Sequence, residues 1–193
     1  MSFLPHITNQ TVGILIEPER LTIALVSPEA RIQKYSYYIF ENNEINDLII
    51  FNTTKIKTFI TNFLVQHNCR SAQIICALDS DQIYQTITPE YPIHLKEELS
   101  HYAWDCYKLN HNCWYTAGIS QELLCHYKIF GLSGPFNIMG ITTKTLAHYE
   151  ACMLLFPNTV DSFALSLEDL KNSLTPLNSA QIIQGLGKIA YTQ

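Results

Sequence analysis

The sequence is poor in basic residues. Its 193 residues include 12 Lys and Arg against 17 Asp and Glu, which gives a formal net charge of −5. The basic residues stand singly or in pairs, so no basic stretch is present that could follow a phosphate backbone. We therefore expect no nucleic acid among the partners of this chain.

Long apolar runs are also missing. No stretch reaches the roughly 18 apolar residues of a membrane span. The opening MSFLPHITNQ has neither the basic start nor the apolar run of a secretory signal. These absences lead us to expect a cytoplasmic protein.

Closely spaced cysteine pairs are absent as well. The six cysteines stand at positions 69, 76, 106, 113, 125 and 152, without the C-x-x-C spacing that is typical of structural zinc sites. Most lie in apolar segments, where buried free thiols are expected. Neighbours such as Cys125 with His126, or His111 with Cys113, point different ways on a regular element, so we expect no metal site and no catalytic Cys–His pair.

The first 40 residues contain an apolar segment that predicts a β-meander. Residues 11–17 and 20–27 are predicted as strands around a tight turn, and the Tyr-rich segment 31–40 as a third strand. After a cap at Asn52, apolar residues at helical spacing predict a helix over 53–66.

The middle of the chain carries strand patterns over 72–78 and 82–88, followed by Pro89 and Pro92. The next segment predicts a helix with Leu95, Leu99, Tyr102, Ala103 and Cys106 on one face. Its charged residues, Lys96, Glu97, Glu98 and Asp105, would then face elsewhere.

Strand and helix alternate through the second half. We predict a strand at 113–119, a helix at 121–130 capped by Ser120, a strand at 136–141 and a helix at 142–155. A connector over 157–178 contains a short strand at 162–165 and a helical turn at 167–174, and a last helix follows. Gly185 and Gly187 weaken that helix by about 1 kcal/mol each, so a packed backbone or a ligand is expected to approach there.

This order of elements resembles the actin-like fold, and most closely the PilM family of type IV pilus assembly proteins with its short HofM relatives. The resemblance rests on Val12-Gly13-Ile14-Leu15-Ile16, AQIICALDSDQIYQTITPEYP, LKEELSHYAWDCYKL, the stretch from CWYTAGIS to ACMLLF, and IIQGLGKIAY. It implies an α/β (α+β) protein: a truncated actin-like (ribonuclease H-like) lobe formed by 1–68 and 121–193, with a small α/β insert lobe at 69–120.

The expected nucleotide site departs from the family pattern. Actin-like ATPases open with V-G-I-D-I-G, in which the Asp addresses the metal and the turn amides wrap the phosphates. Here Leu15 stands at the Asp, Glu17 at the following Gly and Pro18 in the turn, and only a connector follows Phe156 where the family inserts a second lobe. We therefore expect no bound cofactor and no catalysis.

The resemblance implies a binding scaffold at the cytoplasmic face of the inner membrane. Its partner would be the N-terminal tail of a PilN-like membrane protein, held in a groove between core lobe and insert. Carboxylates suit an Arg and aromatic rings supply contact area. The candidate partner-binding residues are Tyr91, Glu97, Glu98, Tyr102 and Asp105, together with the aromatic Trp104.

Two other classes stay open. The chain could be an enzyme, either a degenerate actin-like ATPase that still binds ATP or a Cys-dependent hydrolase, although no nucleophile motif such as G-x-S-x-G is present. It could also be an α/β protein-interaction module unrelated to pili. The sequence leaves the oligomeric state undecided.

Overall fold

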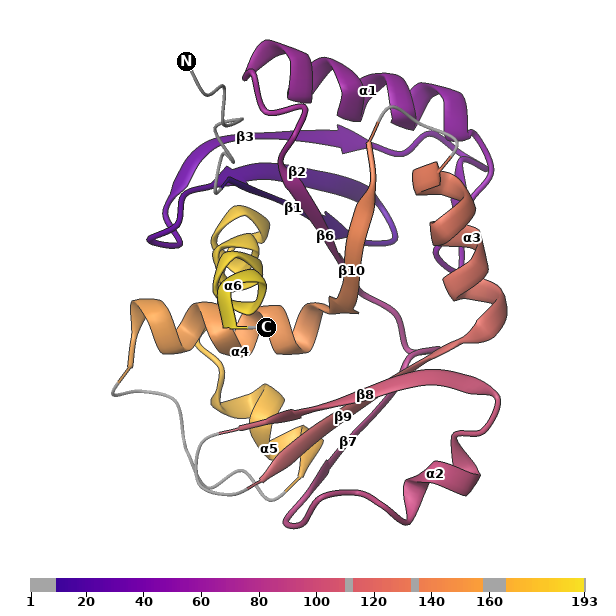
Figure 1. Ribbon diagram of the computed structural model, residues 1–193, viewed down its shortest axis with the longest axis vertical. Helices are drawn as coiled ribbons and strands as arrows, with labels where there is room; N and C mark the ends of the chain where they lie inside the picture. Colours follow the sequence, from indigo (N-terminus) through magenta and orange to yellow (C-terminus); the bar gives the residue numbers. More distant parts are fainter. Residues whose placement is uncertain (1–9, 110–112, 133–135, 158–165, 193) are drawn as a thin grey trace, which may run out of the picture.

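A computed structural model describes residues 10–109, 113–132, 136–157 and 166–192 as two sheets surrounded by helices (Figure 1). One sheet has five strands, the other has three, and a two-stranded ribbon precedes the first helix. The strands are β1 (Thr11–Ile16), β2 (Arg20–Val26), β3 (Ile32–Ile39), β4 (Ile45–Asn46), β5 (Ile49–Ile50), β6 (Gln73–Leu78), β7 (Tyr84–Thr88), β8 (Tyr102–Lys108), β9 (Trp114–Ser120) and β10 (Ile138–Thr143). The helices are α1 (Thr53–Gln66), α2 (Leu95–Glu98), α3 (Gln121–Leu132), α4 (Lys144–Leu155), α5 (Leu167–Ser173) and α6 (Ser179–Thr192).

The five-stranded sheet has the order β10-β6-β1-β2-β3. Strands β1, β2 and β3 form an antiparallel meander, whereas β6 and β10 run parallel to β1. The predicted mixed sheet is therefore confirmed. Because the three parallel strands point the same way, the residues that follow β1, β6 and β10 meet at one edge of the sheet.

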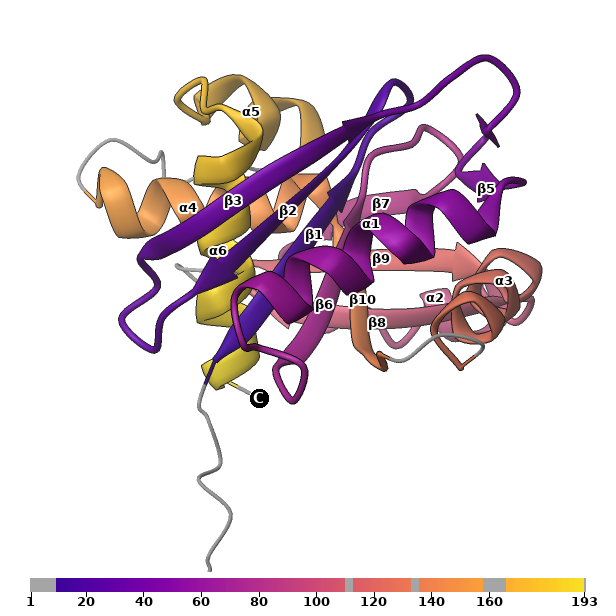
Figure 2. The same cartoon turned by 90° about the horizontal axis from the view of Figure 1, so that it is seen from above.

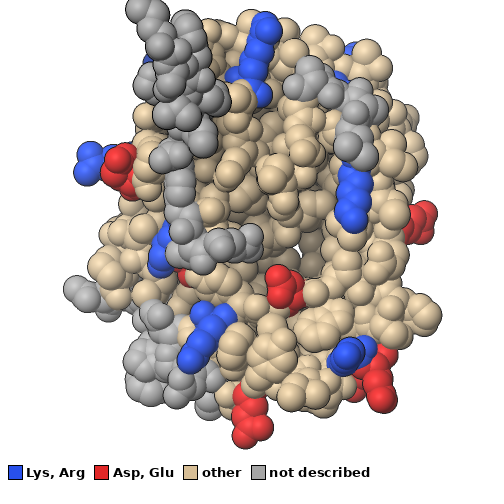
Figure 3. Space-filling model, viewed as in Figure 1, with Lys and Arg blue, Asp and Glu red and all other residues tan. Residues whose placement is uncertain are grey.

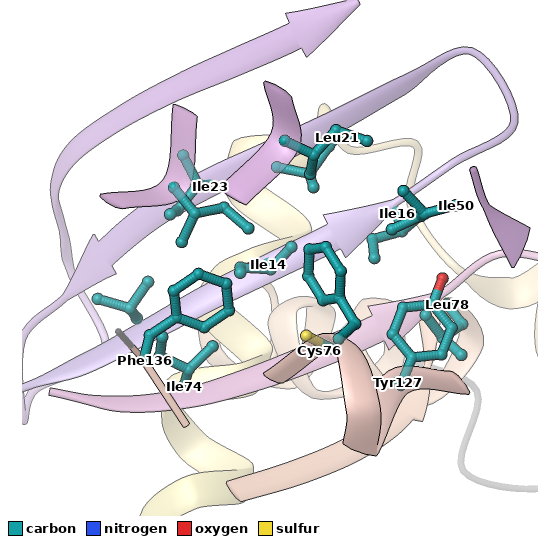
Figure 4. Packing of buried hydrophobic residues seen from close by; sticks show 14 of the residues in the cluster. Ile14, Ile16, Leu21, Ile23, Ile50, Ile74, Cys76, Leu78, Tyr127 and Phe136 are labelled. Carbon is teal, nitrogen blue, oxygen red and sulfur yellow. The ribbon is translucent and has the colours of Figure 1, made fainter. Parts of the chain in front are cut away.

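Helices cover both faces of this sheet. Figures 1 and 2 place α1 and α3 on one face and α4 and α6 on the other, with α6 crossing β1, β2 and β3. Apolar side chains from the first face pack into one buried cluster, in which Tyr127 of α3 lies beside Leu78 of the sheet (Figure 4). Burial from both sides explains why all six residues of β1 are buried.

Most of the other predicted elements lie where the patterns put them. Helix α1 begins after Asn52, whose side chain accepts a hydrogen bond from the Lys55 amide. The Ser120 hydroxyl accepts one from the Leu123 amide at the start of α3. The predicted helical turn in the connector is α5, whereas the strand expected at 162–165 lies outside the described residues.

The predicted helix from Leu95 to Cys106 is wrong. Helix α2 ends at Glu98, and the chain continues as β8, which pairs antiparallel with β9 along its whole length. The i, i+3, i+4 apolar spacing is real, but the Tyr, Trp and Cys residues of this segment favour a strand. Pairing with β9 outweighs the weak helical pattern, because it adds backbone hydrogen bonds between the two segments.

The insert also begins later than expected. The expected insert at 69–120 includes β6, but this strand lies between β1 and β10 in the five-stranded sheet. The second sheet, in the order β7-β9-β8, starts at Tyr84. A strand such as β6, which is apolar and buried from Ile74 to Leu78, is favoured in a sheet with helices on both faces, as in the five-stranded sheet.

The two glycines of α6 accommodate packed neighbours. A Cβ on Gly185 would collide with the Ala147 carbonyl oxygen and lie 2.8 Å from the Ala151 amide nitrogen of α4. A Cβ on Gly187 would come within 2.6 Å of the Val26 side chain. Of the two explanations left open by the sequence, close packing of the protein itself accounts for both positions.

Candidate functional site

The first candidate region lies where the carboxyl ends of β1, β6 and β10 meet. Ligands of open α/β sheets bind at this edge. Glu17 follows β1, Asp79 follows β6, and Lys144 follows β10 as the first residue of α4. Arg20 at the start of β2 and Ser179 at the start of α6 complete a group that we call the Glu17 cluster.

The cluster is built around the Glu17 carboxylate. Lys144 Nζ donates to Glu17 Oε1 at 2.8 Å, while Arg20 Nε and the Ser179 hydroxyl donate to Oε2 at 2.9 and 2.8 Å. Lys144 also donates to Asp79 Oδ2 at 2.7 Å, and Arg20 Nη2 donates to Ser179 Oγ at 2.6 Å. One carboxylate thus joins the β1–β2 turn to the first residues of α4 and α6.

The surroundings keep these groups charged. Burial opposes ionisation of Glu17, but hydrogen bonds from Lys144, Arg20 and Ser179 outweigh it, so the pKa of this carboxyl lies below its ordinary value. Burial likewise opposes the charge on Lys144, but Asp79 and Glu17 outweigh it and raise the pKa of its ammonium group. Both shifts favour the charged forms of Glu17 and Lys144 at neutral pH.

Three features distinguish this edge from the magnesium-nucleotide pattern described above. Leu15, at the position expected for a metal-binding Asp, is fully buried in the core beneath α6. A Cβ on Gly13, the motif glycine, would meet the Ile183 and Leu186 side chains of α6, so this glycine permits helix packing. The Glu17 carboxylate already occupies the cationic groups that phosphates would need.

The second candidate region is a cavity of about 770 Å³ between the two sheets. Strand β8 is an edge of the three-stranded sheet and β10 is an edge of the five-stranded sheet, and both line this cavity, which we call the inter-sheet groove. Its remaining walls come from β9, α3 and neighbouring residues. The lining includes Ile75, Ala103, Trp104, Asp105, Tyr107, Ala117, Ile119, Leu124, Met139, Gly140 and Leu146.

The groove is mainly apolar with a few charges. Asp105 is the acidic residue of its lining, and Lys108 and Lys128 also contribute. All three are exposed. Figure 3 shows the molecule hollowed on this side, with acidic and basic side chains near the hollow. Such a surface can take an extended chain with apolar anchors and one or two charged groups.

The five predicted partner-binding residues do not all line the inter-sheet groove. Asp105 lines the inter-sheet groove, whereas Tyr91, Glu97, Glu98 and Tyr102 are not among the described residues of its lining. Tyr102 and Asp105 lie on opposite faces of β8, since they are three residues apart in a strand. In Figure 1, α2 with its two glutamates lies on the side of the small sheet away from the core. The Tyr91 ring packs edge-on against Trp114, 5.0 Å between centroids.

A buried tyrosine links the two sheets at the groove. The Tyr115 hydroxyl of β9 lies 2.6 Å from Thr143 Oγ1 and donates to Gln85 Oε1 at 2.7 Å. Thr143 also caps α4 through the Leu146 amide. This contact fixes the small sheet against the start of α4.

The neighbours Cys125 and His126 have different surroundings in the structure. Cys125 is exposed, whereas His126 Nε2 accepts a hydrogen bond from the Ile50 amide at 3.1 Å, so the two point different ways. Burial lowers the pKa of His126, in keeping with its role as a neutral acceptor. The pair His111 and Cys113 lies partly outside the described residues.

Sequence reasoning found Glu17 but missed its partners. Asp79, Lys144 and Ser179 are far apart in the chain, and only the sheet topology brings them together. A signal was available for Asp79, because this charged residue directly follows the apolar strand pattern over 72–78.

Within the part of the chain that the structure describes, no helix is both long and apolar enough to span a bilayer. Over the same residues, His, Cys, Asp and Glu side chains form no group of three that could hold a metal ion.

Comparison with known proteins shows similarity of structure without similarity of sequence. No family model matches the chain, and no curated protein matches it. A chain of a PilM–PilN type IV pilus biogenesis complex is similar with a TM-score of 0.57 and 11% identity, over 78% of this chain and 52% of that one. The cytoplasmic domain of EpsL, an inner membrane component of the type II secretion system of Vibrio cholerae, gives 0.47 and 8% over 72% and 57%. A Bacteroides thetaiotaomicron protein described as having an actin-like ATPase fold and unknown function gives 0.45 and 10% over 78% and 59%.

This chain therefore spans little more than half the length of the structures it resembles. At these identities the similarity bears on the fold. The protein has an α/β structure of the actin-like kind, with a mixed sheet and six described helices.

Proposed function

We propose that this protein is a non-catalytic scaffold of a type IV pilus or related type II secretion assembly system. It would bind the extended N-terminal tail of a PilN-like inner-membrane protein in the inter-sheet groove, and so lie at the cytoplasmic face of that membrane. The observation that carries the proposal is the groove itself, an apolar cavity between two strand edges with Asp105 on its wall.

Three features support this assignment. Edge strands offer backbone donors and acceptors to an added extended segment. Apolar lining residues can receive aromatic and aliphatic anchors, and Asp105 can accept an Arg. A similar structure in the comparison belongs to a complex that contains PilN.

The absence of catalysis is part of the proposal. Leu15, Glu17 and the internal ion pairs of the Glu17 cluster argue against the rival reading, a degenerate ATPase. An unrelated interaction module would keep the fold but bind no PilN-type tail, so the experiment must use such a tail.

The test is binding of a synthetic peptide of about a dozen residues with a central apolar-Pro-Trp-Arg core, followed by fluorescence anisotropy. We expect saturable binding that weakens as salt is raised, because part of the attraction is between Asp105 and Arg. Asp105→Lys should weaken binding about fivefold or more, which corresponds to about 1 kcal/mol. Asp105→Asn should have a smaller effect in the same direction.

The matched control is the charge reversal of Glu97 and Glu98 together. Both are exposed on α2, outside the groove lining, so this double variant should bind within about twofold of the unmodified protein. A larger loss in the control than in Asp105→Lys would move the site to the α2 side. No binding of any such peptide would remove the proposed partner.

A further inference from the structure

We propose that Glu17 serves as a built-in anionic ligand: its carboxylate fills an oxyanion site formed by Lys144, Arg20 and Ser179, which a free phosphate or carboxylate can enter when Glu17 is removed. This site is separate from the inter-sheet groove. The inference does not rest on the proposed peptide partner.

The donors converge as they would on a bound ligand. Each of the three is the first residue of its element, so the starts of β2, α4 and α6 come together at this carboxylate. Their contacts with the carboxylate oxygens span 2.8 to 2.9 Å. Hydrogen bonds of this length with charged partners are strong and directional.

The position is favourable for an anion for a second reason. Helices α4, of twelve residues, and α6, of fourteen, both begin at this point. The amino end of a helix carries a partial positive charge and stabilises a nearby anion. Two cationic side chains and one hydroxyl therefore donate to one carboxylate beside the first residues of these helices.

The charges of the cluster balance only while Glu17 is present. Lys144 and Arg20 supply two positive charges, and Glu17 and Asp79 supply two negative ones. Glu17 is the better shielded carboxylate, because its side chain is 13% exposed, against 40% for that of Asp79. Removal of Glu17 would leave one uncompensated positive charge beside an open space of carboxylate size.

The consequence for the intact protein is independence from a diffusible anion. Because the Glu17 carboxylate is covalently part of the chain, it stays at the site at any concentration of phosphate compounds. The β1–β2 turn, α4 and α6 are thus joined permanently, where a ligand-dependent protein would join them only when loaded.

The experiment compares thermal unfolding of the full chain and of Glu17→Ala at neutral pH, in chloride, phosphate and acetate at equal ionic strength. In Glu17→Ala, phosphate at about ten times its dissociation constant should raise the Tm by roughly 3 °C or more relative to chloride. The unmodified protein should shift by less than about 1 °C between the same salts, because its site is filled. Acetate should act in the same direction as phosphate, since it reproduces the lost group.

Two control variants separate this effect from general salt stabilisation. Glu19→Ala removes the same charge from an exposed position two residues away and should respond as the unmodified protein does. Glu17→Ala combined with Lys144→Met should lose the response to phosphate, because the main donor is gone.

Equal responses of Glu17→Ala and the unmodified protein to every salt would overturn the proposal. If Glu17→Ala is unfolded in chloride, recovery of a cooperative transition in phosphate supports it. Failure to fold in all of the salts would count against it, because a free anion would then not replace the tethered one.

Discussion

At the scale of single residues, some carboxylates of this protein are shielded from solvent and bound by several hydrogen-bond donors. Glu17 is one such residue, and Glu44 is another. The Glu44 carboxylate accepts from the Tyr38 hydroxyl, the Glu41 amide and the Asn52 side chain, and it pairs with Lys55. Both residues tie together segments that adjoin the five-stranded sheet.

The state of Glu17 leads to a pH prediction. Its folded-state pKa is lower than the ordinary value of 4.5, so its contribution to stability is present above about pH 4.5 and is lost as the pH falls. At neutral pH, Glu17→Gln should be about 1–2 kcal/mol less stable than the unmodified protein, because Lys144 and Arg20 lose their shared anion. Urea unfolding over a pH series should show the gap between the two proteins narrowing from about pH 5 downward. A gap that is constant or widens in acid would contradict this assignment.

At the scale of elements, the close approach of α6 to α4 depends on Gly185. Alanine favours a helix over glycine by about 1 kcal/mol, but its methyl group would collide with backbone atoms of Ala147 and Ala151, which cannot rotate away. We expect Gly185→Ala to lower the free energy of unfolding by about 2 kcal/mol or more, as measured with urea.

The comparison variant for this prediction is Gly140→Ala in β10. A Cβ there would have Ile75 Cγ2 as its nearest neighbour, at an ordinary 3.9 Å, so stability should change by no more than about 0.5 kcal/mol. A neutral Gly185→Ala would mean that α4 and α6 can separate without loss.

Elements with strong local signals could be predicted from the sequence. Strands β1 and β2 are rich in branched apolar residues, and α1 combines a cap with a regular apolar stripe. The segment 95–106 could not be assigned in this way, because its spacing fits a helix while its residue types fit a strand. Only the partner strand β9 decides between them, and that information is not local.

At the scale of the whole molecule, the candidate sites follow from topology. The order of the parallel strands brings Glu17, Asp79 and Lys144 to one edge, and the two strand edges of the groove belong to different sheets. Neither arrangement leaves a pattern in a single stretch of sequence. The loss of the phosphate-binding pattern at Glu17 and Pro18 could be predicted from the sequence. The residues that bind the Glu17 carboxylate could not.

A bound nucleotide would contact residues from all three parallel strands at this edge of the sheet. We expect neither ATP nor ADP with Mg²⁺ to bind at sub-millimolar affinity in a calorimetric titration. A phosphate charge about 4 Å from the Glu17 carboxylate would be repelled by roughly 4 kcal/mol at an effective dielectric constant near 20. A saturable signal with a micromolar dissociation constant would show that the edge rearranges to admit phosphates, and would favour the ATPase reading.

The packing of α6 also determines the order in which the fold can be completed. This helix covers one face of β1 and β2 and donates to Glu17 from Ser179, a residue 162 positions later in the chain. During synthesis, the meander emerges about ten to thirty seconds before the helix that shields it, at the usual rates of translation. The apolar underside of the first hairpin, with Leu15, Ala24 and Val26, therefore stays uncovered through most of translation. The cover of this early hairpin is therefore completed only by the latest described helix.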